Sequence, residues 1–254
     1  MNILFVTQYY PPEIGAASNR IGYFAEYLAK KGHTVSVLTS APNYPDGKVY
    51  PGHGNRYSYQ KENGVHVHRT RVFLSVNKTA PARIAHYISF ILSSLIAHRK
   101  IKKPELIIAT SPPLFVGLLG VLLKKIWKVK LVLDVRDLWP ESVSSVGAVK
   151  HKGLLRYAAK LASWIYKNAD HITVTSPGIQ KGIVSSFPKK RESITVIPNG
   201  AELDLFRPDI SGEGIRRRWN LNRKFVVLYT GNLGLAQAPE VLIQTAEQLK
   251  EQED

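Results

Sequence analysis

The chain has 254 residues, of which 44% are hydrophobic, an ordinary share for a globular protein and enough to bury a core. It contains no cysteine, which excludes disulfides and thiolate metal sites and fits a reducing cytoplasm. Its 35 Lys and Arg against 19 Asp and Glu give a formal net charge of +16. The first residues, MNILFVTQYYPP, lack the basic start of a signal peptide, and no apolar run of about 18 residues predicts a membrane-spanning helix.

The positive charge is concentrated in the middle of the chain. Between Asn63 and Leu133 the only acidic residue is Glu105. The basic residues of that segment are Arg69, Arg71, Lys78, Arg83, Arg99, Lys100, Lys102, Lys103, Lys124, Lys125, Lys128 and Lys130. A field of this sign attracts polyanions, namely nucleic acid, anionic lipid headgroups or diphosphate-bearing substrates, and charge alone does not choose among them.

The first predicted elements are two strands separated by a helix. Residues 2–7 (NILFVT) are a continuous apolar run, which is typical of a buried parallel strand. Residues 17–31 carry apolar side chains at helical spacing and stop before a glycine, and residues 33–39 (HTVSVLT) alternate as a strand does. A polar loop rich in Pro and Gly is predicted for residues 40–63.

The same alternation continues as far as residue 198. Strands are predicted at 65–73, 105–110, 130–135, 171–176 and 194–197, and helices at 81–102, 112–127 and 152–167, with a short helix from the end of the strand at 171–176 to about residue 187. Strands that alternate with helices indicate βαβ units and a parallel sheet covered on both faces. The predicted fold class is therefore α/β, with residues 1–198 forming one doubly wound, Rossmann-like domain of roughly seven strands.

Beyond this domain the sequence predicts the start of a second one. Residues 199–224 read as a linker, residues 225–230 (FVVLYT) as a buried strand and residues 239–250 as an amphipathic helix. One strand and one helix bury too little surface to fold alone. They either dock on the first domain or, as we expect, belong to an incomplete C-terminal domain of residues 225–254.

The loop after the first strand, QYYPPEIGAASNR, is a candidate ligand site. In an open parallel sheet, ligands bind beyond the carboxyl ends of the strands. Gly15 permits a close backbone approach, and Ala16 begins a helix whose free N–H groups attract an anion. The loop lacks the G-x-G-x-x-G pattern, so a nicotinamide cofactor is not expected. A plain strand-to-helix turn is the structural alternative.

A second candidate site is LDVRDLWPES, where a buried strand runs into charged residues. Asp137 is a candidate to orient or deprotonate a sugar hydroxyl, next to Arg136 and Glu141. Trp139 is a candidate to stack on the apolar face of a sugar. The alternative is an Arg136–Asp137 ion pair beside a tryptophan that belongs to the core.

The loop YTGNLGLAQAPE is a third candidate, because Gly231 and Gly234 leave a predicted strand before a helix. Such a loop presents backbone N–H groups to a diphosphate. The turn at Asn199 and Gly200, within IPNGAELDLF, reads as a hinge.

No metal site is expected from the sequence. Glu202 and Asp204 are two carboxylates without further ligands, which favours a solvated linker. His66 and His68 share one face of a strand, but no third ligand is evident and a solvated strand face is the more frequent arrangement.

Taken together, five segments resemble the family 4 retaining glycosyltransferases of the two-domain GT-B type. The segments are YYPPEIGAASNR, TSAPNYPDGKVYPG, RDLWPES, PNGAELDLF and GNLGLAQ, which occur in the family's order along the whole chain. The resemblance is strongest to the branch that builds O-antigen, capsule and colanic acid polysaccharides, including fucosamine transferases.

The resemblance implies that residues 1–198 hold the acceptor and the second domain holds the donor nucleotide. By position, Gly15 and Ala16 would lie near the donor diphosphate, and Glu13 would lie at the mouth of the cleft as a catalytic candidate. Arg136 and Asp137 would lie at the catalytic site, with Trp139 and Glu141 toward the acceptor. The glycine loop of the donor side corresponds to Gly231, Asn232, Gly234 and Gln237.

The sequence also departs from the family pattern. Many relatives have Arg and Lys where this chain has Asn232 and Gln237, and Ala238 replaces a more usual glycine. The E-x7-E donor segment has no counterpart, because the chain ends before it. A chain without a complete donor half is not expected to transfer sugar by itself, because the geometry of donor and acceptor would not be fixed.

The implied activity is transfer of a sugar from a nucleotide-diphosphate-sugar to a lipid-diphosphate-linked glycan, with retention of configuration and without metal or other cofactor. The expected location is cytoplasmic, on the inner face of the inner membrane, bound peripherally to anionic lipid. No nucleic-acid-binding signature accompanies the basic residues, so no nucleic acid partner is expected. Two alternatives remain open, namely a nucleotide-sugar epimerase on the same fold and a non-enzymatic basic module that binds membrane or nucleic acid.

Overall fold

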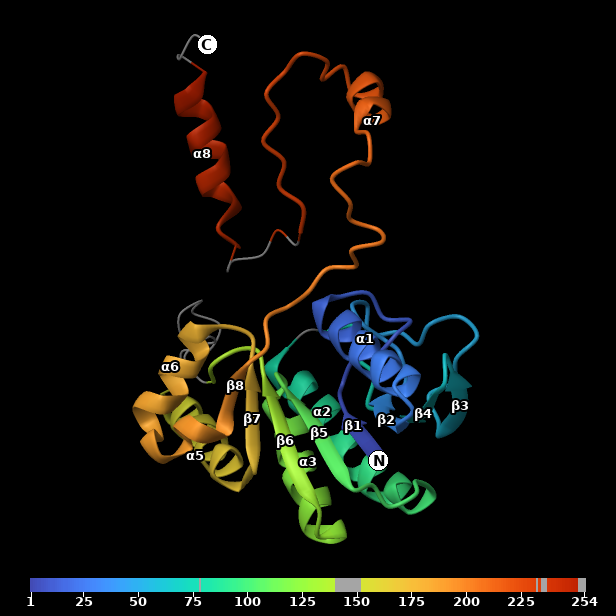
Figure 1. Ribbon diagram of the computed structural model, residues 1–254. Helices are drawn as coiled ribbons and strands as arrows, with labels where there is room; N and C mark the ends of the chain where they lie inside the picture. Colours follow the sequence, from blue (N-terminus) through green and yellow to red (C-terminus); the bar gives the residue numbers. More distant parts are fainter. Residues whose placement is uncertain (78, 140–151, 232, 234–236, 251–254) are drawn as a thin grey trace. The chain divides into compact units, whose positions relative to one another are not determined.

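The computed structural model describes residues 1–77, 79–139, 152–231, 233 and 237–250 (Figure 1). The described residues divide into two compact units, the first ending at Asn199 and the second beginning at Gly200.

The first unit is built on a sheet whose eight strands, within the described residues, run in the order β3-β4-β2-β1-β5-β6-β7-β8 (Figure 1). The strands are β1 (Asn2–Val6), β2 (Thr34–Ser40), β3 (Ser58–Glu62), β4 (Val65–Thr70), β5 (Leu106–Ser111), β6 (Lys130–Val135), β7 (His171–Val174) and β8 (Ile194–Val196). All neighbours pair in parallel except β3 and β4. The predicted doubly wound α/β sheet is confirmed.

Strand β1 lies at the centre and shows why its sequence is apolar throughout. It pairs with β2 on one side and β5 on the other, and its side chains alternate between two hydrophobic clusters. Ile3 and Phe5 join one cluster, and Leu4 and Val6 join the other. Because both faces of the sheet are covered, a parallel strand in this position has no polar side.

Among the described residues, the helices of the first unit are α1 (Ala16–Lys30), α2 (Ala80–Ala97), α3 (Leu114–Trp127), α5 (Lys152–Asn168) and α6 (Pro177–Ser186), with the 3₁₀ helices η1 (His98–Lys100) and η2 (Pro188–Ser193). Helix α1 packs on one face, whereas α2 and α3 contribute to the cluster on the other face. Helix α3 sits close to the sheet at Gly120, where a Cβ atom would lie 2.5 Å from the Cβ of Ala109. A larger residue at this position would push the helix off the strand.

Strand β3 corrects the prediction of an unbroken loop over residues 40–63. Its sequence, SYQKE, lies at the edge of the sheet and pairs antiparallel with β4. The strand is polar and mostly exposed, so it has no buried face to produce an apolar alternation. Edge strands of this kind are therefore hard to detect from hydrophobic pattern.

The second unit contains the helices α7 (Glu213–Arg218) and α8 (Pro239–Leu249) among its described residues. The predicted strand at residues 225–230 is wrong, since this segment forms no ladder and Phe225 is 93% exposed. The physical reason is that a parallel strand needs a neighbouring strand for its hydrogen bonds, and the described part of this unit has none. The predicted linker over residues 199–224 also contains a helix, α7.

Candidate functional site

The candidate site lies at the carboxyl edge of the sheet, where the segments that follow β1, β2 and β4 meet. A pocket of about 260 Å³ opens between these segments and the first turns of α2. It is lined by Tyr9, Asn43, Tyr44, Pro45, Gly47, Ser75, Asn77, Ala82, Arg83, His86 and Tyr87. All of these residues belong to the first unit, and ligands of open α/β sheets bind at this edge.

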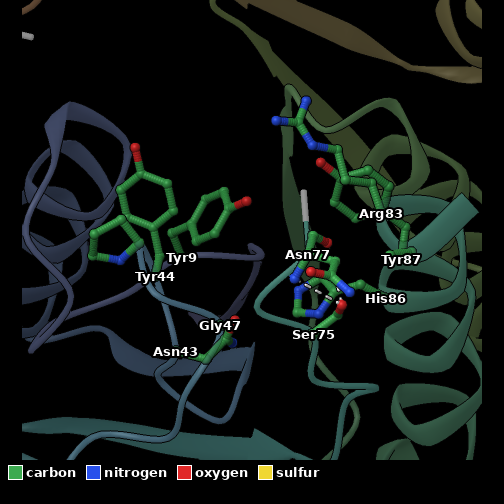
Figure 2. Close-up of a pocket in the computed structure, with 11 residues that line it drawn as sticks. Tyr9, Asn43, Tyr44, Gly47, Ser75, Asn77, Arg83, His86 and Tyr87 are labelled. Atoms are coloured by element: carbon green, nitrogen blue, oxygen red, sulfur yellow. Dashed lines mark hydrogen bonds between the residues drawn. The ribbon is translucent and has the colours of Figure 1, made fainter. Parts of the chain in front are cut away.

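Figure 2 shows how polar groups face the pocket from two sides. Tyr9 and Tyr44 stand on one wall with their ring centroids 5.2 Å apart, and Arg83 extends from α2 on the opposite wall. Aromatic faces with nearby hydroxyl and guanidinium donors are the groups that bind a sugar ring and its hydroxyls. The pocket therefore combines aromatic faces with hydroxyl and guanidinium donors.

Glu13 holds two walls of this pocket together. One of its carboxylate oxygens accepts hydrogen bonds from the backbone N–H of Asn43 at 2.8 Å and of Tyr44 at 2.9 Å. The other accepts from the backbone N–H of Tyr10 at 3.2 Å. The side chain is buried, and this burial raises the pKa of Glu13, although the three N–H groups and the charge of Arg69 act against it.

The predicted role of Glu13 at the mouth of a cleft is therefore replaced by a buried structural role. Both oxygens are occupied by the backbone of the loops after β1 and β2. The residue holds the two loops that form the pocket wall in place.

His86 lies in the wall formed by α2, and its bonding partners determine its tautomer. Its Nδ1 lies 2.7 Å from the carbonyl oxygen of Phe73, so Nδ1 carries the proton and donates. Its Nε2, 2.9 Å from the side-chain amide nitrogen of Gln8, then accepts. Burial lowers the pKa of His86. The ring is thus a neutral group that joins α2 to the segments after β1 and β4.

Tyr9 and Tyr87 form a hydrogen-bonded pair inside the pocket. Burial raises the pKa of Tyr9, and the charge of Glu13 and the Tyr87 hydroxyl add to the increase. Burial also raises the pKa of Tyr87, while Arg83 acts in the opposite direction. Both phenols therefore stay protonated at neutral pH, and one of their two O–H groups is donated within the pair.

Arg136 and Asp137 leave β6 at the same edge of the sheet. The Arg136 guanidinium donates to the carbonyl oxygen of Pro112 at 2.7 Å, while its buried Nε has no partner. Burial lowers the pKa of Arg136, and the charges of Asp134 and Asp137 oppose this. Asp137 is exposed to solvent.

Trp139 is placed differently from its predicted role as a sugar platform. The indole is partly buried and packs against the main hydrophobic cluster, as the structural alternative had it. Glu141 lies outside the described residues, as do Asn232 and Gly234 of the glycine loop.

Gly15 and Ala16 form the N-terminus of α1. Gly15 is the N-cap, and its carbonyl accepts from the backbone N–H of Asn19 at 2.9 Å. No atom lies within 4 Å of the position that a Cβ of Gly15 would occupy, so the approach to the helix end is open. Ser18, one turn further on, is buried and its hydroxyl has no partner. This end of the helix is suited to an anion.

The described residues of the third candidate loop belong to the second unit. Gly231 and Gln237 are exposed there. Their assignment to the donor diphosphate stays a prediction.

The two histidines of β4 are bonded to tyrosines. The hydroxyl of Tyr59 lies 2.7 Å from Nδ1 of His66, and that of Tyr57 lies 3.0 Å from Nδ1 of His68. Across the described residues no group of three or more His, Cys, Asp or Glu is arranged to hold a metal ion.

The sequence had not singled out most of the residues that line the pocket. Tyr9, Tyr44 and His86 are separated by 35 and 42 positions in the chain and meet only through the topology of the sheet. The one available signal was that Tyr9 and Tyr44 lie in loops directly after strands.

The chain is similar in sequence to known glycosyltransferases. The family described as "Glycosyl transferase 4-like domain" matches residues 15–200. The "Putative colanic acid biosynthesis glycosyl transferase WcaI" of Escherichia coli (strain K12) is 30% identical over 271 residues, covering 99% of this chain and 64% of that protein. The chain thus spans less than two thirds of this curated relative.

Two solved structures share the fold. Anabaena Alr3699/HepE, in complex with UDP and glucose, aligns with a TM-score of 0.59 and 18% identity over 98% of this chain and 58% of that one. Arabidopsis thaliana UGT89C1, complexed with quercetin, aligns with a TM-score of 0.50 and 10% identity over 97% of this chain and 62% of that one. The family resemblance drawn from the five sequence segments is confirmed.

Proposed function

The chain belongs to the family of glycosyl transferase 4-like domains, and from this premise we propose that it is the acceptor-side part of a glycosyltransferase for a surface polysaccharide. The sugar would come from a nucleotide-diphosphate-sugar and pass to a glycan acceptor. The observation that carries the proposal is the pocket at the carboxyl edge of the sheet, with its tyrosines facing Arg83.

In the proposed reaction the bond between the anomeric carbon and the diphosphate oxygen breaks while the acceptor hydroxyl attacks that carbon. Negative charge develops on the departing diphosphate and is stabilised by oriented N–H groups and cations. The open N-terminus of α1 at Gly15 and Ala16 and the guanidinium of Arg136 are the groups of the first unit that suit this role. Gly231, Asn232, Gly234 and Gln237 would add backbone N–H groups from the second unit.

The acceptor hydroxyl must lose its proton during the transfer. Asp137 is the exposed carboxylate at the end of β6, and we assign it the role of base, with a donor phosphate oxygen as the alternative. Asp137→Asn should lower kcat more than it weakens donor binding, measured by initial rates and by isothermal titration with the nucleotide-sugar. An unchanged kcat would remove Asp137 from the mechanism.

The assay for the proposal uses the protein extended to the length of its curated relative. A panel of nucleotide-sugars that includes UDP-glucose is incubated with lipid-diphosphate-linked acceptors, and transfer is followed by mass spectrometry. We expect retention at the anomeric carbon, read by NMR of the product, and rates that EDTA does not change. An inverted product or loss of activity with EDTA would contradict these parts of the proposal.

The same assay separates the two rival functions. A nucleotide-sugar epimerase would convert the donor without an acceptor. A non-enzymatic basic module would show salt-sensitive binding to membrane or nucleic acid and no affinity for nucleotide-sugars.

We also propose that the acceptor is lipid-linked and that the protein acts at the cytoplasmic face of the inner membrane. Helix α2 supports this, because Ile84, Ile88, Leu92 and Ile96 recur at every fourth position and are all exposed. The segment Ala80–Lys100 is long and apolar enough to cross a membrane by length and composition, and most of it is not buried in the fold. A surface helix of this kind suits the membrane interface.

Basic residues add an attraction for anionic lipid. Lys124, Lys125, Lys128 and Lys130 lie around a groove at the amino edge of the sheet, and each basic residue near an anionic surface contributes about 1 kcal/mol.

Leu92→Asp, on the exposed apolar face of α2, should lower sedimentation with phosphatidylglycerol vesicles without changing the melting temperature. Equal sedimentation of the unaltered protein with neutral and anionic vesicles would remove the membrane from the proposal.

A further inference from the structure

A buried ion pair joins α1 to strand β6. The Arg20 guanidinium donates to both carboxylate oxygens of Asp134, at 3.1 Å from Nε and 3.0 Å from Nη2. Thr173 of β7 donates a further bond to Asp134 at 2.8 Å. The two charged side chains are only 4% and 2% exposed, so neither charge is hydrated to any extent.

The remaining donors of Arg20 bind the segment by which the chain leaves the first unit. Nη2 donates to the carbonyl oxygen of Ile197 at 2.9 Å, and Nη1 donates to the carbonyl of Pro198 and the side-chain oxygen of Asn199, both at 3.1 Å. All five N–H groups of the guanidinium are therefore used. The exit segment, residues 197–199, is otherwise exposed and follows a strand of only three residues.

From this geometry we infer that Arg20 is a positioning residue that fixes where and in which direction the chain leaves the first unit. The inference rests on the proposed function, in which the donor and acceptor are held by different units. Arg20 also lies one turn after the N-terminal end of α1 at Ala16. The same helix therefore carries both the candidate diphosphate site and the arginine that binds the exit segment. The reaction geometry then depends on a residue that touches neither substrate.

Two properties make arginine necessary in this position. Its planar fork matches the carboxylate of Asp134 with two parallel bonds, and its remaining N–H groups point to other acceptors. Lysine keeps the charge but has a single nitrogen, which cannot reach the carboxylate and the two exit carbonyls together. Arg20→Lys should therefore keep the fold and release the exit segment in part.

The decisive variant removes both charges, because removal of one would leave the other buried and unpaired and would strongly destabilise the fold. In Arg20→Met/Asp134→Leu the pair is replaced by apolar side chains. The matched control is Lys124→Met/Asp170→Leu, which removes a cation and a carboxylate bonded at 2.7 Å at the amino edge of the sheet. Backbone ¹⁵N relaxation is measured for all three proteins.

We expect an order parameter of about 0.85 for the Asn199 amide in the unaltered protein and in the control, and below about 0.6 in Arg20→Met/Asp134→Leu. In the protein extended to the length of its relative, the same variant should lower kcat by about tenfold to a hundredfold with donor KM changed less than twofold. The inference would be overturned if the Asn199 amide kept its high order parameter in Arg20→Met/Asp134→Leu. It would also be overturned if Asn199 became mobile in this variant while kcat stayed unchanged. If the unaltered extended protein transfers no sugar, the proposed function fails, and the relaxation measurement still decides whether Arg20 holds the exit.

Discussion

The two edges of the central sheet carry similar charged residues in different surroundings. At the carboxyl edge, Asp134 and Glu13 are buried, and their oxygens are bonded to a guanidinium, a hydroxyl and backbone N–H groups. At the amino edge, Asp170 is about a quarter exposed and pairs with Lys124 and with Lys130, which is itself mostly exposed. The difference shows that polar groups at the carboxyl edge are buried in a fixed arrangement at a cost in stability. Such a cost is expected of a functional site.

The largest effect is expected from Asp134→Ala, which leaves the Arg20 guanidinium buried without its counter-ion. Breaking a buried pair on one side costs about 3–5 kcal/mol. The free energy of unfolding, measured by urea denaturation, should fall by that amount. A loss below about 1 kcal/mol would show that water reaches Arg20 and that the two edges are alike.

A smaller effect is expected from Glu13→Gln, because the amide offers one acceptor oxygen where the carboxylate offers two. At least one of the N–H groups of Tyr10, Asn43 and Tyr44 loses its partner, at a cost of about 1–3 kcal/mol. The pocket walls should also loosen, visible as faster hydrogen exchange at the Asn43 amide.

The pH dependence of Glu13 provides a second test of the same residue. Its pKa is raised in the folded state, so the folded protein binds its proton more readily than the unfolded chain. The contribution of Glu13 to stability is therefore present below the unfolded pKa, about 4.3, and is lost as the pH rises through the folded pKa. Urea titrations from pH 4 to 8 should show this component in the unaltered protein and lack it in Glu13→Gln.

Binding at the two edges should also differ. Arg83→Ala removes a charged donor from the pocket at the carboxyl edge and should weaken glycan binding about tenfold, or 1.4 kcal/mol. Lys125→Ala at the amino edge is the matched control and should leave glycan affinity unchanged. Titration calorimetry with soluble acceptor glycans measures the affinity of both variants. If both lost the same affinity, the change in net charge would be the cause.

The smallest effect is expected from Asp170→Asn, at no more than about 1 kcal/mol, since the carboxylate is partly exposed. Partial burial acts to raise its pKa, but hydrogen bonds from Lys124, the Leu131 backbone and Lys130 together lower it. Its contribution is present above the unfolded Asp pKa and is lost as the pH falls through the folded value, opposite in sign to that of Glu13. A pH profile of the same sign for both residues would break the comparison.

The fold could be predicted from the sequence wherever a strand is buried on both faces. Residues 2–7 and 130–135 are such strands, and their apolar runs cannot be satisfied at a surface. Strand β3 was missed because its polar residues face solvent, and the run at 225–230 was misinterpreted because pairing depends on neighbours that a local pattern does not specify.

The sequence predicted that the site lies at the carboxyl edge of the sheet, but it did not predict which residues line the pocket. Loops after strands pointed to Gly15 and Asp137, both of which lie at the carboxyl edge of the first unit. The opposing roles of Trp139 and Tyr9 could not be distinguished, because each is an aromatic residue after a buried strand. Only the packing decides which ring joins the core and which faces a pocket.

The two outermost strands of the sheet, β3 and β8, affect whether the protein aggregates at high concentration. Unpaired strand edges recruit strands from other molecules, and short or charged edges discourage this. One margin here is β3, with Lys61 and Glu62 on an exposed strand, and the other is β8, which is three residues long. Growth of fibres by edge addition is therefore disfavoured on both sides. Variants designed to resist aggregation would leave the strands unaltered and replace exposed apolar residues of the second unit, such as Phe225 and Val227.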